Sequence, residues 1–224
     1  MNFSSSLQGQ HVVVVGGTSG IGQAVVAAVQ VAGAKVTALG RGSAIVCDVT
    51  DPIGVNRAFE GLGPVDHLVI TVGARVGSPS LAQLTDAELA LTYEVKLFGA
   101  LRALRAALPK LAPRASVTLT SGLLSRKPSA GGLLKGSVNA AIEAAARQLA
   151  KELAPRRVNV VSPGVVDTEL WSGATRETTL ARIGAGLPVG RVGLPHELAQ
   201  AYVLAMTNGF MTGSVIDVDG GGLL

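Results

Sequence analysis

Residues 11–22 read HVVVVGGTSGIG, and this stretch decides the fold. His11–Val15 has the composition of a buried β-strand, and an alanine- and valine-rich helical segment runs from Gly20 to Ala32. The glycines between them let the backbone turn sharply and approach a pyrophosphate, whose charge the helix N-terminus stabilises. A glycine-rich turn alone is common, but between a strand and a helix it predicts a dinucleotide-binding site.

The remainder of the chain alternates short β-branched segments with longer alanine- and leucine-rich ones. We expect further strands at residues 35–39, 44–47, 67–71, 116–120, 157–161 and 214–218, and helices around 86–111, 135–153 and 195–206. Continuous apolar strands are covered on both faces, so the sequence predicts an α/β fold. The expected architecture is a doubly wound parallel sheet, a Rossmann fold, in a single domain of residues 1–224.

One connection in this pattern is unusually short. Only residues 40–43 separate the second and third expected strands. A parallel crossover normally needs a dozen or more residues, usually including a helix. We therefore expect the helix between the second and third strands to be missing.

Composition and charge narrow the class of protein. Hydrophobic residues make up 48% of the chain and charged ones 15%, which argues against disorder. The net charge of +4 comes from dispersed basic residues without interleaved aromatics, so we expect no nucleic-acid partner. The lone Cys47 excludes an intrachain disulfide, argues against a structural zinc site and favours a buried apolar role, and we expect no metal. Residues 1–7 lack a signal-peptide pattern and no apolar run could span a bilayer, so we expect a soluble cytoplasmic protein without a membrane partner.

The glycine turn resembles the Gly-x-x-x-Gly-x-Gly fingerprint of the short-chain dehydrogenase/reductase family, with Gly16, Gly20 and Gly22 as its glycines. Val15 replaces the threonine that usually precedes them. The likeness continues in residues 47–51 (CDVTD), 68–73 (LVITVG), 162–168 (SPGVVDT), 211–213 (MTG) and 218–221 (VDGG). The second of these stretches departs in part, because both asparagines of the family's Asn-Asn-Ala-Gly motif are absent from residues 68–73.

The resemblance implies a nicotinamide cofactor. The residues expected to bind it are Gly16, Thr18, Ser19, Gly20, Ile21, Arg41, Ser43, Asp48, Val49, Val72, Gly73, Pro163, Gly164, Val166 and Thr168. Gly40 stands where NAD binders carry an acidic residue, and Arg41 follows it. Because a guanidinium suits the 2′-phosphate of NADP, we expect NADP(H) rather than NAD(H). The alternative for Arg41 is an ordinary solvated turn residue.

The same resemblance places an altered catalytic tetrad. Family enzymes use a tyrosine, a lysine, a serine and an asparagine to reduce a carbonyl. Here Ser121 takes the serine position, Lys135 the tyrosine position, Asn139 the lysine position and Lys96 the asparagine position. We expect Ser121 to polarise the substrate and Lys135 to donate the proton, with the pKa of Lys135 lowered by a second lysine and by burial.

Plainer roles stay open for these residues. Ser121 has the alternative of capping a turn, and Lys135 that of the first solvated residue of a helix. Tyr93 is a candidate for the missing phenol, although packing is the favoured role for it.

Two functions therefore remain open from the sequence. The first is an NADP(H)-dependent oxidoreductase that reduces a small carbonyl substrate, or oxidises the corresponding alcohol. The second is a catalytically silent NADP(H)-binding regulatory or partner protein. Residues 169–187, with Trp171, are expected to cover the site as a lid. The resemblance also implies a homodimer or homotetramer built through the helices at 86–111 and 135–153.

Overall fold

The computed structural model describes residues 7–224. The prediction that residues 1–7 are not a signal peptide falls almost entirely outside the described residues, which begin at residue 7. A seven-stranded parallel sheet forms the centre, in the order β3-β2-β1-β4-β5-β6-β7. Its strands are β1 (His11–Val15), β2 (Lys35–Gly40), β3 (Ile45–Val46), β4 (Val65–Ile70), β5 (Leu111–Thr120), β6 (Arg157–Pro163) and β7 (Val215–Val218). The prediction of a doubly wound parallel sheet is confirmed.

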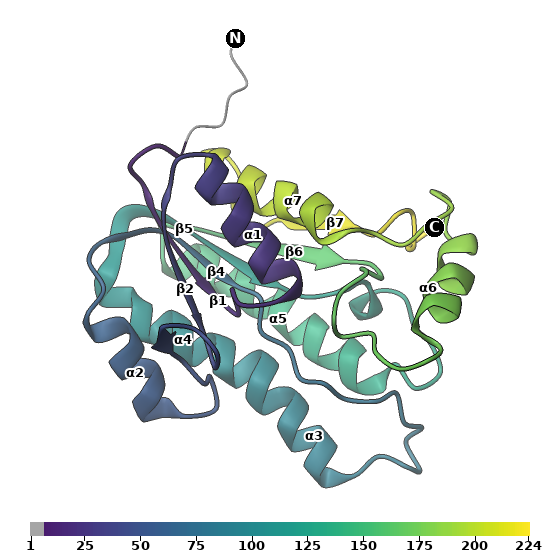
Figure 1. Ribbon diagram of the computed structural model, residues 1–224. Coiled ribbons are helices and arrows are strands. Elements are labelled where there is room, and N and C mark those ends of the chain that lie inside the picture. The colour runs from purple at the N-terminus through teal and green to yellow at the C-terminus, as the bar shows by residue number, and fades with distance from the viewer. Residues whose placement is uncertain (1–6) are drawn as a thin grey trace.

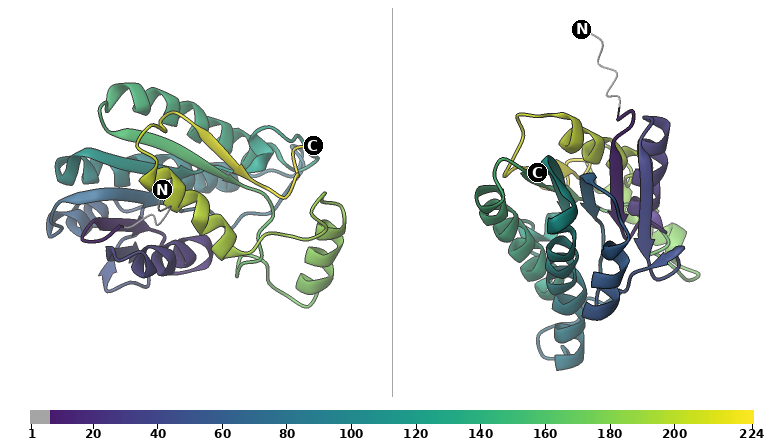
Figure 2. Two further views of the ribbon diagram at one scale, coloured as in Figure 1. Left: turned by 90° about the horizontal axis from the view of Figure 1, so that it is seen from above. Right: turned by 90° about the vertical axis from the view of Figure 1, so that its left-hand side faces the viewer.

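Helices cover both faces of this sheet (Figures 1 and 2). They are α1 (Gly20–Val31), α2 (Pro52–Glu60), α3 (Asp86–Tyr93), α4 (Gly99–Ala107), α5 (Leu133–Glu152), α6 (Arg176–Ala185) and α7 (Pro195–Thr207). Helices α1 and α7 pack together on one face, and α2, α4 and α5 lie on the other. Helix α6 stands apart from both layers. No helix among residues 7–224 is long and apolar enough to cross a membrane.

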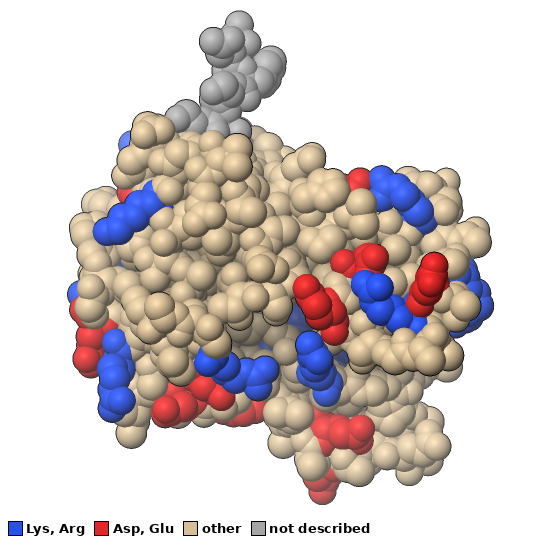
Figure 3. Space-filling model, in the orientation of Figure 1, with Lys and Arg blue, Asp and Glu red and all other residues tan. Residues whose placement is uncertain are grey.

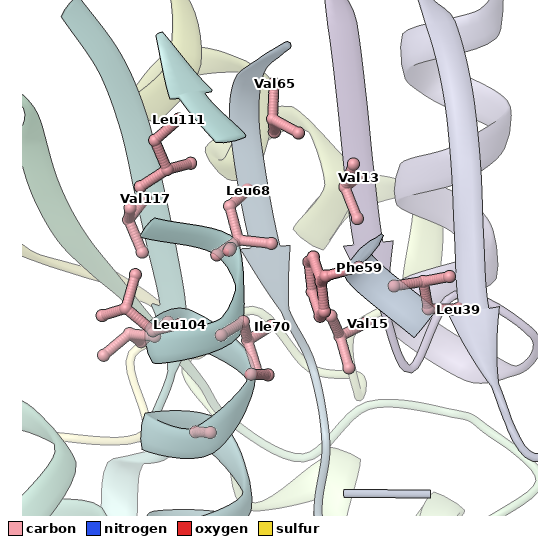
Figure 4. Close-up of a cluster of buried hydrophobic side chains, with 14 of the residues drawn as sticks. Val13, Val15, Leu39, Phe59, Val65, Leu68, Ile70, Leu104, Leu111 and Val117 are labelled. Carbon is pink, nitrogen blue, oxygen red and sulfur yellow. The ribbon is translucent and has the colours of Figure 1, made fainter. Parts of the chain in front are cut away.

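Two buried clusters attach the helices to the sheet. In the cluster of Figure 4, Phe59 of α2 lies beside Val15 and Leu39, and Leu104 of α4 faces β4 and β5. A second cluster joins α1 and α7 to the opposite face of β1, with the fully buried Tyr202 among its members. Because both faces of the strands are buried, the sheet holds the loops at its edges in fixed positions.

The link between β2 and β3 contains no helix, as predicted. The Ser43 hydroxyl donates hydrogen bonds to the carbonyls of Gly40 at 2.9 Å and Ile45 at 2.6 Å, and the Cys47 N–H donates to Gly40 at 2.9 Å. These hydrogen bonds hold the turn closed, so that residues 39–40 of β2 pair in parallel with residues 45–46 of β3. Cys47 itself is buried, and burial raises the pKa of its thiol to about 11.

Helix α2 was not among the predicted elements. Asp51 caps it by accepting from the Ile53 N–H at 3.0 Å, and Pro52 occupies its first turn. Asp-Pro is a recognisable helix start, so this signal was present in the sequence.

The helices expected around residues 86–111 are present as α3 and α4. Between α3 and α4, residues Glu94–Phe98 form a π-helical segment, η1, and the N–H of Gly99 donates to the Glu94 carbonyl. Two short 3₁₀ segments are η2 (Leu108–Lys110) and η3 (Leu123–Ser125). Lys96, one of the predicted site residues, lies in this π turn.

Candidate cofactor and active site

The sequence-predicted site residues gather at the carboxyl ends of the strands. The glycine turn follows β1, residues 71–73 follow β4, Ser121 follows β5 and residues 164–168 follow β6. In parallel α/β sheets this edge is where ligands bind. The first and last of these loops meet, because a Cβ built on Gly20 would lie 3.4 Å from Cγ2 of Thr168.

The glycine turn has the shape of a phosphate cradle. Gly16 and Gly20 have φ angles of +85° and +52°, in the left-handed region that favours glycine. A Cβ at Gly22 would lie 2.1 Å from the Gly16 oxygen, so no side chain fits there. At the N-terminus of α1, Ser19 makes no capping hydrogen bond and the first turn carries no acidic residue. The turn therefore offers uncapped N–H groups to an anion, and these residues fit a pyrophosphate.

Thr71 is a functional residue that the sequence analysis missed. Its hydroxyl, directly after β4, donates toward the carbonyls of Val15 at 3.1 Å and Gly16 at 3.2 Å. It therefore fixes the start of the glycine turn from the neighbouring strand. A hydroxyl at a strand end was the available signal, but only the β1–β4 pairing shows what it contacts.

The end of β2, where a ribose phosphate would lie, is formed by Gly40 and so carries no acidic side chain. A Cβ at Gly40 would lie 3.1 Å from Thr18 Oγ1, which leaves little room for a larger side chain. Arg41 is exposed. The Ser43 hydroxyl, however, is engaged by the carbonyls of its own turn, so it supplies no free donor in this conformation.

Asp48 and Val49 lie together beyond β3. Oδ1 of Asp48 accepts from the N–H of Thr50 at 2.9 Å and from its hydroxyl at 2.8 Å. These hydrogen bonds, with the nearby charge of Arg41, hold the pKa of Asp48 below its usual range, so its carboxylate stays an acceptor. Arg102 donates to the Val49 carbonyl at 3.1 Å and fixes that backbone.

The loops after β4 and β6 complete the predicted cofactor site. Val72 packs at the edge of the core and Gly73 is exposed. Pro163 ends β6 as a buried residue. A Cβ at Gly164 would lie 2.7 Å from the Asp219 Cα, so this close approach requires glycine. Val166 is buried, and the Thr168 hydroxyl accepts from the Leu170 N–H at 3.4 Å. Ile21, in the first turn of α1, packs against the core.

Ser121 faces a buried carboxylate that the sequence did not reveal. Its side chain is 3% exposed, and its hydroxyl donates to Oε1 of Glu143 at 2.9 Å. The Ser125 hydroxyl donates to the same oxygen at 2.7 Å, and Arg126 Nε lies 3.7 Å from the other. Glu143 lies on α5 two turns beyond Lys135. The hydroxyl predicted to polarise a substrate is thus directed into the protein.

Lys96 reaches the same strand end from the π turn. Its ammonium donates to the Ser121 carbonyl at 2.9 Å. The pKa of Lys96 is lowered to about 8, mainly by burial and also by the charge of Lys135, while the charge of Glu143 acts in the opposite direction. The π turn places this ammonium beside β5, whereas the phenol hydroxyl of Tyr93 makes no hydrogen bond with any residue from 7 to 224.

Lys135 and Asn139 occupy one face of α5, four residues apart. The Lys135 ammonium donates to the Ser78 hydroxyl at 3.1 Å, and burial lowers its pKa. The pKa of Lys135 is therefore lowered as predicted, but by burial. The repulsion between the two lysines lowers the pKa of Lys96 instead. Asn139 is buried; its Nδ2 donates to the Gly122 carbonyl at 3.2 Å and its Oδ1 has no partner among the described residues.

Comparison with known proteins agrees with this geometry. A family model described as enoyl-(acyl carrier protein) reductase matches residues 15–222. The chain is 31% identical to the short-chain dehydrogenase/reductase ATR9 of Stachybotrys chlorohalonatus, covering 98% of this chain and 99% of that protein. The chain belongs to the short-chain dehydrogenase/reductase family.

Other members are comparably similar over their length. Carbonyl reductase family member 4 of Xenopus laevis is 30% identical, over 93% of this chain and 95% of the relative. A small-chain dehydrogenase crystallised in complex with NADPH is 39% identical with a TM-score of 0.92, covering 96% and 99% of the two chains. The MalC reductase/Diels-Alderase of Malbranchea aurantiaca is 28% identical with a TM-score of 0.88, covering 97% and 98%.

The region predicted to cover the family's site carries α6. Trp171 is half-buried, and its Nε1 donates to the Val166 carbonyl at 3.1 Å. Arg176, at the start of α6, pairs with Asp167. These contacts tie the first half of the segment to the loop after β6. No group of His, Cys, Asp and Glu able to hold a metal ion occurs within residues 7–224.

Proposed function

We propose that this protein is an NADP(H)-dependent oxidoreductase that reduces a small carbonyl substrate to the alcohol, with Lys135 as the proton donor. The observation that carries the proposal is the partly buried Lys135 ammonium at the carboxyl edge of the sheet. It forms no ion pair with any residue between 7 and 224, and burial lowers its pKa. An ammonium of lowered pKa gives up its proton more readily at neutral pH.

The choice of NADP(H) over NAD(H) rests on the end of β2. Gly40 provides no carboxylate for a ribose hydroxyl, and the exposed Arg41 follows it. A carboxylate there would repel a 2′-phosphate, whereas a guanidinium binds one through charge-assisted hydrogen bonds. The NADPH complex of the 39% identical relative supports the same choice.

The chain's own residues divide the chemistry as follows. When bound, the cofactor supplies the hydride that the carbonyl carbon accepts. The Lys135 ammonium donates a hydrogen bond to the carbonyl oxygen, transfers its proton there as the alcohol forms, and regains a proton from water. Because the Ser121 hydroxyl is engaged by Glu143, we assign the polarising role to Lys135 and a positioning role to Ser121, whose carbonyl holds Lys96.

The test is turnover with the purified protein. NADPH is mixed with a panel of small aldehydes, ketones and oxo acids, and the loss of NADPH absorbance is followed. We expect turnover with at least one substrate class and its loss in Lys135→Gln. If no carbonyl compound consumes NADPH above the buffer rate, the proposal is wrong.

The alternative, a silent NADP(H)-binding regulatory or partner protein, is favoured by one observation. The Ser121 hydroxyl points into the protein, and the phenol of the family tetrad is replaced by an amine. Titration of NADPH separates the two functions, because tight binding without turnover supports the silent protein. Failure to bind NADPH would contradict both.

We also propose that the protein forms a homodimer or homotetramer through α3, α4 and α5. Three large apolar side chains of the α3–η1 stretch, Leu89, Leu91 and Phe98, are 43%, 46% and 47% exposed. Light scattering during gel filtration measures the oligomeric state, and a monomer at micromolar concentration would contradict the proposal.

A further inference from the structure

The ammonium groups of Lys96 and Lys135 form a pair that is not neutralised within the described chain. Each donates one hydrogen bond, and both acceptors, the Ser121 carbonyl and the Ser78 hydroxyl, are uncharged. An ammonium has three N–H donors, so each lysine keeps two for another partner. Neither lysine forms an ion pair with any residue from 7 to 224.

Holding two ammonium groups together without a counter-ion costs free energy. Lys135 lies one turn before Asn139 on α5, and Asn139 donates to the Gly122 carbonyl, next to the Ser121 carbonyl that Lys96 contacts. At this separation the charge of Lys135 lowers the pKa of Lys96. Partial burial adds to this cost, since it removes water from both groups. A bound anion would relieve both effects.

Glu143, whose charge acts on Lys96, forms no ion pair with either lysine. Glu143 accepts hydroxyl hydrogen bonds from Ser121 and Ser125, and Arg126 lies 3.7 Å from its second oxygen. Arg126 is shared in turn with Asp217, with which it forms a two-pronged ion pair. Glu143 is thus satisfied inside the protein, while the lysine pair keeps excess positive charge.

The charges of the dinucleotide do not fill this place either. The residues that fit the pyrophosphate and the 2′-phosphate follow β1 and β2. Lys96 contacts the end of β5, which β4 separates from β1 in the sheet. An anion at the lysine pair therefore has to come with the substrate.

We infer that the Lys96–Lys135 pair binds a carboxylate that the substrate carries next to its carbonyl or hydroxyl group, so that the substrates are oxo acids and hydroxy acids. The inference rests on the proposed function and names the substrate class for the same site. Lys135 contacts both groups, because one of its N–H donors serves the carboxylate while another faces the reacting oxygen.

The test measures binding without turnover. With NADPH bound, a hydroxy acid cannot be oxidised, so its affinity is read from calorimetry or from a shift in melting temperature. The probes are lactate, 3-hydroxybutyrate and mandelate, each compared with its amide, which has the same shape and no charge. We expect at least one acid to bind at least 10-fold more tightly than its amide at pH 7.

Three variants test whether Lys135 carries the preference. Lys135→Gln should abolish the preference for the acid, and Lys135→Arg, which keeps the charge, should retain most of it. Lys151→Gln removes the same charge from an exposed position on α5 and should leave the preference unchanged. Equal affinity for acid and amide throughout the series, or a preference that survives Lys135→Gln, would overturn the inference.

Its failure is distinguishable from that of the proposed function. Turnover of neutral ketones at rates equal to those of oxo acids, with equal affinity for acids and amides, would leave the reductase in place and remove the carboxylate site. Acid-selective binding without turnover of any carbonyl compound would support the carboxylate site and contradict the reductase.

Discussion

The glycine turn after β1 and the end of β5 lie on the same edge of one sheet, but they depend on different parts of the structure. The turn is made by backbone: Gly16 and Gly20 adopt left-handed angles, and Gly22 leaves no space for a Cβ. The end of β5 is made by side chains that come from η1 and α5. The first region is therefore recognisable from a short sequence, while the chemistry of the second depends on which side chains the fold brings together.

The difference also appears in the way charge is handled. The glycine turn needs no charged side chain, because uncapped N–H groups at the start of α1 attract an anion. The end of β5 concentrates two lysines and a buried glutamate. Elsewhere on the molecule, acidic and basic side chains are interspersed over the face in Figure 3, without a continuous basic band.

The largest effect is expected from Lys135→Gln, which removes the proposed proton donor and leaves the glycine turn intact. Loss of general acid catalysis should lower turnover roughly 100-fold or more. The dissociation constant of NADPH should change less than about twofold, because uncharged Gln leaves the phosphate sites in place. Steady-state kinetics and NADPH titration measure the two effects. Lys151→Gln is the matched control, and unchanged turnover in Lys135→Gln would remove Lys135 from the mechanism.

Gly22→Ala tests the backbone region. The new Cβ would lie 2.1 Å from the Gly16 oxygen and 2.5 Å from Thr71 Oγ1, so the turn has to move. We expect unfolding to become easier by roughly 1–3 kcal/mol, as for overpacked sites, together with weaker NADPH binding. Urea denaturation and cofactor titration check this. The control is Gly63→Ala, where no atom lies within 4 Å of the new Cβ. Equal effects of the two changes would contradict the requirement for glycine at residue 22 in the phosphate-binding turn.

Arg41→Ala should weaken NADPH binding about 10-fold and leave NADH binding nearly unchanged, since charge-assisted hydrogen bonds contribute about 1.5–3 kcal/mol before solvent screening. The ratio of the two affinities is the measurement. Lys35→Ala, at the opposite end of β2, is the charge-matched control. A parallel loss of NADH affinity would mean that Arg41 contacts something other than the 2′-phosphate.

The smallest effect concerns pH and Lys96. Its pKa is lowered to about 8, from about 10.4 in an unfolded chain, by burial and by the charge of Lys135, with Glu143 acting in the opposite direction. Between these values the unfolded state binds more protons, so stability should rise with pH relative to Lys96→Met, by roughly 1 kcal/mol between pH 7.5 and pH 9. Denaturation at pH 7.5 and pH 9 in both proteins measures the difference. Identical pH dependence would show that Lys96 is not held in a desolvated site.

Much of the fold could be predicted because its signals are local. The strand of residues 11–15, the short link of residues 40–43 and the helix start at Gly20 each follow from neighbouring residues. Helix α2 was missed although Asp51-Pro52 signals its start, and the π turn at Glu94–Phe98 lies between the helices expected around residues 86–111. Such a turn adds no recognisable pattern to the sequence.

The sequence by itself determined the sheet, the phosphate turn and the identities of the four residues at the catalytic positions. Only the tertiary structure decided what these residues do to each other. Ser121 and Glu143 are 22 positions apart and Lys96 and Ser121 are 25 apart, so their contacts depend on how α5 and η1 pack against β5. Burial, charge and hydrogen bonds from residues far away in the sequence set the direction of the Ser121 hydroxyl and the pKa of Lys96. Both properties depend on the surroundings of the residue and not on its identity alone.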